Sequence, residues 1–305
     1  MIKAGGFFCK RKVTATPSLY IFNLIDTMLK KAILIIFDGL GDRPIKELNG
    51  QTPLEAAHTP NLDQFAKGAE CGLMYTLGRG VVPSSDTAHF CLLGYDINTD
   101  YPGRGPIEAK GIGIDLKEGD VALRANFATV KIEDGKKIVT DRRAGRDGNF
   151  QPLTDLLQGI EIDGIEFIVR QGTGYRAVVV MRGSGLSSQI YGNDPKDVNV
   201  PVNTGKKLIL DYETLDAEER KRAEFTANVI EKFTDEVYKR LNDCSCNAER
   251  EATGLLPGNF FLARSAGKYQ HIQPFEEKFG LKAANIAGGG LYRGVAGLMG
   301  MEMVD

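Results

Sequence analysis

The stretch that decides the fold reads Lys31-Ala32-Ile33-Leu34-Ile35-Ile36-Phe37-Asp38-Gly39-Leu40-Gly41-Asp42. Its six consecutive apolar residues, 32–37, predict a strand buried on both faces inside a mainly parallel sheet. Asp38 follows at the carboxyl end of this strand, where open α/β sheets place their ligands. Asp38 is therefore a candidate ligand of a metal ion or a substrate. The alternative is that Asp38 caps the next helix or closes a turn.

A second polar position is Ser85, in the stretch Pro83-Ser84-Ser85-Asp86-Thr87-Ala88-His89-Phe90. Serine and aspartate ahead of helix-forming residues predict a helix start. A hydroxyl there faces the N–H groups and the positive dipole end of the helix, an environment that suits a phosphate. Together with Asp38, Ser85 makes the pair that a metal-activated serine nucleophile needs. The alternative is that Ser85 is only an N-cap.

Several motifs resemble one known family. The stretches 37–44, 52–57 and 59–63 are similar to the opening of cofactor-independent phosphoglycerate mutases of the archaeal type, which belong to the alkaline phosphatase superfamily. Further similar stretches follow in the same order at 85–89, 103–106, 126–130, 141–146 and 176–180. The resemblance runs from about Met28 to Val304. It implies an alkaline-phosphatase-like α/β core with a mainly parallel sheet and an inserted α+β domain.

Composition narrows the class of protein. The chain has 305 residues, 42% of them hydrophobic and 26% charged, as in ordinary globular proteins. A net charge of −2 gives no electrostatic reason to expect a nucleic acid or an anionic membrane as partner. Five scattered cysteines argue against a disulfide framework. No apolar run approaches the roughly 20 residues of a membrane span. We therefore expect a cytoplasmic protein. The resemblance implies an enzyme with a small-molecule substrate, and the oligomeric state is left open.

The expected domain organisation has four parts. Residues 1–27 match no motif; either translation begins at Met28 or they form a poorly ordered extension. Residues 28–118 form the first part of the phosphatase-like domain, 119–282 the inserted substrate-binding domain, and 283–305 a return to the first domain. Glu133-Asp134-Gly135 predicts a hairpin turn. The long loop 186–205 predicts either a substrate lid or surface disorder. Strands are expected at 71–77, 121–130, 137–142, 165–170, 174–182, 259–263 and 283–287, and helices at 59–69, 216–242 and 275–279.

Arginines are frequent at the loop and strand ends of the inserted domain. A guanidinium group binds phosphate and carboxylate in bidentate fashion, and a phosphoglycerate carries one of each. For any single arginine the alternative is a solvated surface residue. By resemblance, the residues in motifs that line the family's substrate cleft are Arg124, Asn126, Arg142, Arg143, Arg176 and Arg264.

The resemblance also implies a reaction. It is the conversion of 3-phosphoglycerate to 2-phosphoglycerate in glycolysis and gluconeogenesis, without 2,3-bisphosphoglycerate. Ser85 would carry the phosphoryl group as phosphoserine, and two divalent metal ions, commonly manganese, would bind at Asp38 and Ser85. Two alternatives are open: a phosphatase or another phosphomutase of the same superfamily, or an inactive fragment that only binds substrate.

The sequence departs from the family pattern in two places. The family's metal site is completed by Asp and His residues of a C-terminal segment, whereas this chain ends at Met301-Glu302-Met303-Val304-Asp305. The chain is therefore expected to be truncated, with only Asp38 and Ser85 carried over as metal ligands. We expect little or no mutase activity from it, even with manganese. Arg293 stands where the family pattern leads us to expect a lysine.

Overall fold

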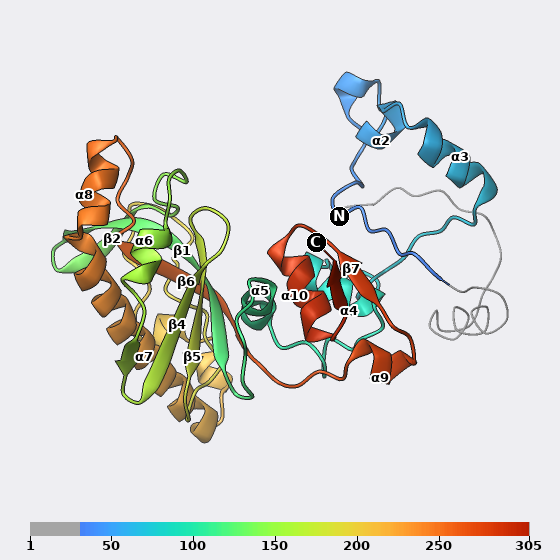
Figure 1. The fold of residues 1–305 in the computed structure, drawn as a ribbon. Coiled ribbons are helices and arrows are strands. Elements are labelled where there is room, and N and C mark those ends of the chain that lie inside the picture. The colour runs from blue at the N-terminus through green and yellow to red at the C-terminus, as the bar shows by residue number, and fades with distance from the viewer. Residues whose placement is uncertain (1–30, 305) are drawn as a thin grey trace. The chain divides into compact units, whose positions relative to one another are not determined.

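The computed structural model describes residues 31–304, so the predicted extension 1–27 lies outside the described residues. The chain divides into two compact units after Asp96, and each is described by itself (Figure 1). Within the described residues, the sequence predicts domain boundaries after residues 118 and 282. The segment 97–118 belongs to the second unit because its helix α5 (Arg104–Gly111) packs against β1, β6 and α10 of that unit.

The first unit contains short helices joined by extended chain. Its elements are η1 (Lys46–Leu48), α2 (Pro53–Ala56), α3 (Pro60–Gly68) and α4 (Ser85–Leu92). Thr59 and Pro60 start α3 as predicted. The small buried part of this unit gathers at α4, where Phe90 and Tyr95 meet edge to face with ring centroids 6.1 Å apart.

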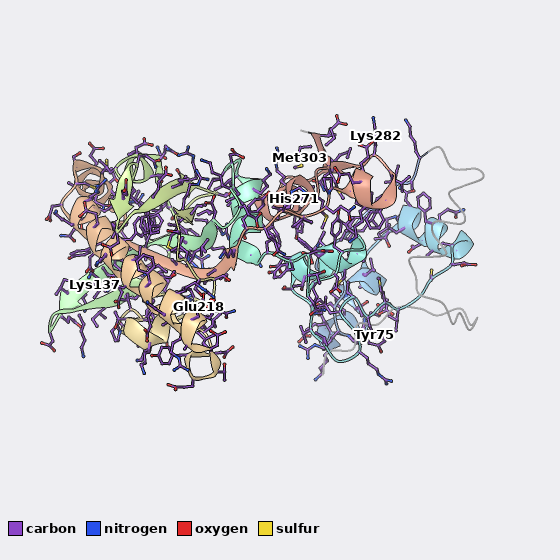
Figure 2. The ribbon with its side chains drawn as sticks, turned by 90° about the horizontal axis from the view of Figure 1, so that it is seen from below. Tyr75, Lys137, Glu218, His271, Lys282 and Met303 are labelled. Atoms are coloured by element: carbon purple, nitrogen blue, oxygen red, sulfur yellow. The ribbon has the colours of Figure 1, made fainter. Side chains whose placement is uncertain are left out.

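The prediction of a buried strand at 32–37 is wrong for this structure. The run has no strand geometry, and its apolar side chains are exposed, Ile33 by 87% and Phe37 by 56%. The predicted strand at 71–77 is also missing, and Tyr75, labelled in Figure 2, is 62% exposed. A strand needs neighbours that take up its N–H and C=O groups, and no strand within 31–304 pairs with either run.

The second unit is built on a six-stranded antiparallel sheet. The strands run in the order β2-β1-β5-β4-β3, and β6 pairs with the first half of β1. Asp134 and Gly135, both at positive φ, form the predicted hairpin turn between β1 and β2. The bounds are β1 Val121–Glu133, β2 Lys136–Asp141, β3 Ile160–Ile162, β4 Ile165–Gln171, β5 Arg176–Arg182 and β6 Phe260–Lys268.

The long helix α7 (Ala217–Asn242) packs against one face of this sheet (Figure 1). Asp216 caps it by accepting hydrogen bonds from the Glu218 and Glu219 amides. The apolar residues that recur at helical spacing are buried, as the sequence predicts. Phe233 of α7 stacks on Phe167 of β4 with ring centroids 4.1 Å apart. Shorter helices α6 (Gln151–Asp155) and α8 (Ser245–Ala252) and turns η2 (Gly205–Leu208) and η3 (Tyr212–Thr214) complete this part.

Helix α5 contacts the sheet and also α10 (Gly290–Leu298) through glycines. A Cβ on Gly105 would lie 1.8 Å from the Ala122 carbonyl oxygen, and one on Gly294 would lie 1.9 Å from that of Ile107. Beside α10 lie α9 (Phe275–Phe279) and the parallel pair β7 (Ala284–Ile286) and β8 (Glu302–Val304). Within residues 31–304, β7 and β8 are the strands that pair in parallel, and the pairings in the six-stranded sheet are antiparallel. The described fold is thus a mixed α/β structure with a mostly antiparallel sheet, and the mainly parallel sheet predicted for the core is not observed.

The loop 186–205 is partly built into the sheet edge. Gly192 bridges to Arg264 of β6, and a Cβ on it would lie 2.1 Å from the Ala263 carbonyl oxygen. The Asn193 side chain donates to the Phe261 carbonyl (2.9 Å) and accepts from the Ala263 amide (2.6 Å). Surface disorder is therefore wrong for residues 192–194. Among residues 31–304, no helix is both long enough and apolar enough to cross a membrane.

Candidate active site

The structure brings Ser85 and Asp38 together although they are 47 residues apart. The Ser85 hydroxyl donates a hydrogen bond of 2.7 Å to Oδ2 of Asp38. Ser85 is the first residue of α4, and Asp38 lies in the turn after the exposed apolar run, where Gly39 has a φ of +81°. The two residues that the sequence proposes as a pair are thus within hydrogen-bond distance, although no strand leads into Asp38. The turn and the helix start are enough to bring them together.

The neighbouring polar groups of α4 serve the helix start. Ser84 is the N-cap residue, its amide donates to the Thr87 hydroxyl (3.2 Å), and its own hydroxyl bonds to the Asp86 carboxylate. Nδ1 of the buried His89 lies 2.6 Å from the Ser85 carbonyl oxygen, which accepts from it. The plain N-cap role therefore belongs to Ser84. This leaves the Ser85 hydroxyl directed at a carboxylate.

In the second unit, four of the predicted residues share one face of the sheet. Arg124 lies directly opposite Arg264 across β1 and β6, and Asn126 lies opposite Arg176 across β1 and β5. Cross-strand partners lie on the same face of a sheet, as do residues two apart on one strand. The face is the one opposite α7, because the odd-numbered neighbours Leu123, Ala125 and Phe127 lie in the core that α7 covers. We call this set the arginine face.

A bulge in β6 adjusts the direction of Arg264. The pairing of β1 with β6 shifts between Ala122 and Arg124, and Ser265 has a φ of +56°. An extra residue in one strand of an antiparallel pair bends that strand and re-aims the side chains beside it. Arg264 is thereby brought to a buried carboxylate, that of Asp194.

Asp194 holds two of the predicted arginines. Arg142 donates to it through Nε (3.1 Å) and Nη2 (2.8 Å), and Arg264 donates through Nη1 (2.7 Å). The Asp194 side chain has no exposed surface. Burial raises the pKa of its carboxyl, but the hydrogen bonds from Arg142 and the Lys196 amide and the nearby positive charges outweigh burial, so the pKa is lowered overall. The same bond raises the pKa of Arg142.

Glu108 of α5 is a second carboxylate that pairs with two arginines. Its Oε1 lies 3.1 Å from Nε of Arg104 and 3.2 Å from Nε of Arg124. Burial and the neighbouring Arg104 lower the pKa of Arg124, Glu108 opposes this, and Arg264 and Arg176 lower it further. Arg104, Arg124, Arg142, Arg176 and Arg264 thus gather around two carboxylates, Asp194 and Glu108. Five arginines and two carboxylates leave this group of described residues with a net charge of three positive units, although only Arg176 among the five arginines makes no ion pair there.

Tyr175 lies between the remaining predicted arginines. The guanidinium carbon of Arg176 is 5.2 Å from the centre of its ring, and that of Arg143 is 6.0 Å away. Arg176 is exposed, and no ion pair to either arginine occurs within residues 31–304. The Asn126 side chain is buried and donates to the Arg142 carbonyl (3.3 Å), so it supports the backbone that carries Arg142.

Sequence reasoning missed Asp194, Glu108 and Tyr175. Glu108 and Tyr175 lie next to similar stretches and Asp194 lies in the loop 186–205, yet an isolated acid or tyrosine at such a position carries no signal of its own. Arg104, from the similar stretch 103–106, begins α5, a helix that the sequence does not predict. Helix α10 begins at Gly290 with Gly289 as its N-cap residue, and the sequence does not predict this helix either. Two cavities of about 540 and 320 Å³ in the second unit are lined by none of the predicted site residues.

The described donor set does not fit a two-metal centre. Within residues 31–304, no group of three His, Cys, Asp or Glu side chains is placed to hold a metal ion. Asp38 and Ser85 supply at most three oxygen atoms, and hard divalent cations take about six oxygen ligands. The metal ions that the resemblance implies would therefore have few protein ligands here.

We accordingly expect weak manganese binding by the 305-residue chain. The weakest complete oxygen-ligand sites for Ca²⁺ have dissociation constants of about 10⁻⁴–10⁻³ M. Because Asp38 and Ser85 supply fewer ligands, we expect a dissociation constant of about 10⁻³ M or weaker. Electron paramagnetic resonance of free Mn²⁺ during a titration measures it, and Asp38→Ala should weaken binding further. Two manganese ions bound with micromolar affinity would show that ligands have been overlooked.

Comparisons with known proteins agree on one family. Residues 66–247 match the family profile of 2,3-bisphosphoglycerate-independent phosphoglycerate mutase. Enzymes of that name from Methanococcus aeolicus and Methanocaldococcus jannaschii are 45% and 44% identical over 275 and 277 residues. In both cases the match covers 90% of this chain and 64% of the relative. The chain thus spans somewhat less than two thirds of the length of these relatives.

Two solved structures are similar as well. The cofactor-independent phosphoglycerate mutase of Thermoplasma acidophilum superposes with a TM-score of 0.58 at 38% identity, covering 88% of this chain and 68% of that one. A protein of Pyrococcus horikoshii superposes with a TM-score of 0.66 at 28% identity, covering 88% of this chain and 59% of that one. The chain belongs to the family of 2,3-bisphosphoglycerate-independent phosphoglycerate mutases.

Proposed function

We propose that the chain interconverts 3-phosphoglycerate and 2-phosphoglycerate through a phosphoserine at Ser85. The observation that carries this proposal is the excess of three positive charges that Arg104, Arg124, Arg142, Arg176 and Arg264 have over Asp194 and Glu108. A phosphomonoester carries about −1.5 to −2 charges at pH 7, and the carboxylate of glycerate adds one more. The charge of the substrate thus matches the excess of these five arginines over the two carboxylates.

The chemistry assigned to the first unit is nucleophilic. In the first half-reaction the Ser85 hydroxyl passes its proton to the Asp38 carboxylate, 2.7 Å away, and Oγ forms a bond to phosphorus. The bond from phosphorus to the C3 oxygen breaks, and that oxygen takes up the proton as a hydroxyl. The second half-reaction is the reverse, with the C2 hydroxyl as the attacking group.

The role assigned to the arginines is retention of glycerate between the two half-reactions. Guanidinium groups held by Asp194 and Glu108 keep a fixed orientation, so they bind a carboxylate with little loss of side-chain freedom. Glycerate that stays bound can present its other hydroxyl to the phosphoserine. If glycerate escaped, water would receive the phosphoryl group and the enzyme would act as a phosphatase.

The test is product analysis by ³¹P NMR after prolonged incubation with 3-phosphoglycerate and excess manganese. Because Asp38 and Ser85 alone supply few metal ligands, we expect a low rate, with 2-phosphoglycerate as the product. Inorganic phosphate as the main product would favour the phosphatase alternative. No conversion, together with no binding of phosphoglycerate, would contradict the proposal.

Arg176→Ala is expected to weaken phosphoglycerate binding by about 1.5–3 kcal/mol, the value of a hydrogen bond to a charged group. Arg176 is exposed and lies beside the Tyr175 ring, so its loss should affect the ligand more than the fold. Isothermal titration calorimetry with 3-phosphoglycerate measures the change. Arg220→Ala is a matched control, because Arg220 also lies 5.2 Å from a tyrosine ring, that of Tyr212, outside the arginine face. Unchanged affinity in Arg176→Ala would remove this residue from the site.

A further inference from the structure

The loop 142–148, which we call the arginine loop, carries Arg142, Arg143 and Arg146 in an unusual backbone. Four of its seven residues have positive φ: Ala144 (+43°), Gly145 (+75°), Arg146 (+73°) and Gly148 (+99°). Residues other than glycine adopt this conformation only when the surrounding structure holds them there. On one side of the loop, Asp141 at the end of β2 accepts hydrogen bonds from the Arg143 and Gly145 amides at 2.7 and 3.1 Å. On the other side, the carbonyl oxygens of Ala144 and Asp147 need a hydrogen-bond donor.

Arg250 of α8 supplies it. Its Nη2 donates to the carbonyl oxygens of Ala144 (3.1 Å) and Asp147 (3.0 Å), and its Nε donates to that of Leu256 (3.1 Å). The guanidinium carbon lies 4.2 Å from the centre of the Phe150 ring. A planar group with several donors can bond carbonyls and stack on a ring at once, which the single ammonium of lysine cannot do.

The setting of Arg250 points to a role beyond packing. The residue is 6% exposed, and no carboxylate contacts it within the described residues. A buried cation without an anionic partner is costly, and an apolar residue of similar size would fill the space at lower cost. Gly148 leaves room for the guanidinium, since a Cβ on it would lie 2.5 Å from Nη1. Two positions of the chain are thus adapted to keep this cation behind the loop.

We propose that Arg250 is a positioning residue that holds the arginine loop in its left-handed conformation, so that Arg142 and Arg143 are presented for substrate binding. The part concerning substrate rests on the proposed function. The part concerning the loop does not, because the hydrogen bonds from Arg250 to the loop go to the backbone carbonyls of Ala144 and Asp147. Arg250 does not touch the substrate in this proposal.

The experiment compares Arg250→Met, Arg250→Lys and the control Arg240→Lys. Arg240 is a suitable control because it also donates to two backbone carbonyls, those of Leu156 and Gln158, in another loop. Hydrogen–deuterium exchange of the Gly145 and Arg146 amides should be faster in both Arg250 variants and unchanged in the control. Calorimetry should show about tenfold weaker binding of 3-phosphoglycerate to Arg250→Met, which corresponds to about 1.4 kcal/mol.

A double-mutant cycle with Arg143→Ala separates positioning from general destabilisation. If Arg250 acts through the loop, the loss caused by Arg250→Met should shrink clearly when Arg143 is already absent. Additive losses, or unchanged exchange of the loop amides in Arg250→Lys, would overturn the proposal. A wild-type chain that binds no phosphoglycerate would refute the proposed function alone, because the exchange measurement still decides the role of Arg250 in the loop.

Discussion

Ser85→Ala is expected to abolish formation of phosphoserine from 3-phosphoglycerate, whereas Ser84→Ala should largely retain it. The reason is geometric. The Ser85 hydroxyl points to Asp38 at 2.7 Å, while the Ser84 hydroxyl bonds to Asp86 within its own helix start. Without the Ser85 oxygen there is no nucleophile next to the carboxylate that takes the proton.

The measurement is mass spectrometry of the peptide that contains both serines, after acid quenching of protein mixed with substrate and excess manganese. This detects a single phosphoryl transfer and does not depend on a high turnover rate. Ser84→Ala should cost about 1 kcal/mol of stability as a lost N-cap, which a thermal melt reports separately. Phosphate on Ser84, or on neither serine in the wild-type chain, would refute the assignment.

Asp194→Asn is expected to be the most destabilising single substitution proposed for the second unit. It removes the charge that Arg142 and Arg264 share, and the new amide group adds donors where two guanidiniums already donate. Breaking a buried ion pair costs about 3–5 kcal/mol. We expect the lower end, about 3 kcal/mol, because the arginine side chains remain 25% and 22% exposed.

Urea unfolding measures this loss, and the control is Asp235→Asn. Asp235 forms an ion pair with Lys137, but the Asp235 side chain is 65% exposed. Its substitution should therefore lower the free energy of unfolding by less than about 1 kcal/mol. Lys137 is labelled in Figure 2. Equal losses in the two variants would mean that burial of Asp194 adds nothing. Phosphoglycerate binding to Asp194→Asn should weaken as well, because both arginines lose their anchor.

The same carboxylate predicts a pH dependence. The pKa of Asp194 is lowered in the folded chain, so its contribution to stability is complete above the unfolded value of about 3.9. The contribution is lost as the pH falls below that value and through the lowered folded pKa. Between pH 7 and 5, therefore, the difference in stability between wild type and Asp194→Asn should stay constant, and it should shrink in stronger acid.

The sequence by itself was enough to identify the family and to propose Asp38, Ser85 and the arginines as site residues. Motifs around Asp38, Ser85 and the arginines are local in sequence, so they can be read without a structure. Local signals also placed the β1–β2 hairpin, the β4–β5 pair and α7, because a turn residue or a 3.6-residue period acts within one segment. Comparison with known proteins confirmed the family.

Only the tertiary structure decided which of these residues have partners. Arg124 and Arg264 lie opposite each other because β6 returns to β1 after some 130 residues, a pairing that no local pattern reveals. Asp194, Glu108 and Arg250 became visible only where the fold buries them against arginines or carbonyl groups. The apolar run 32–37 also shows that tertiary partners decide the structure of a segment. Its composition is that of a buried strand, but a strand forms only where neighbouring strands supply hydrogen bonds and cover, and no described strand does so for this run.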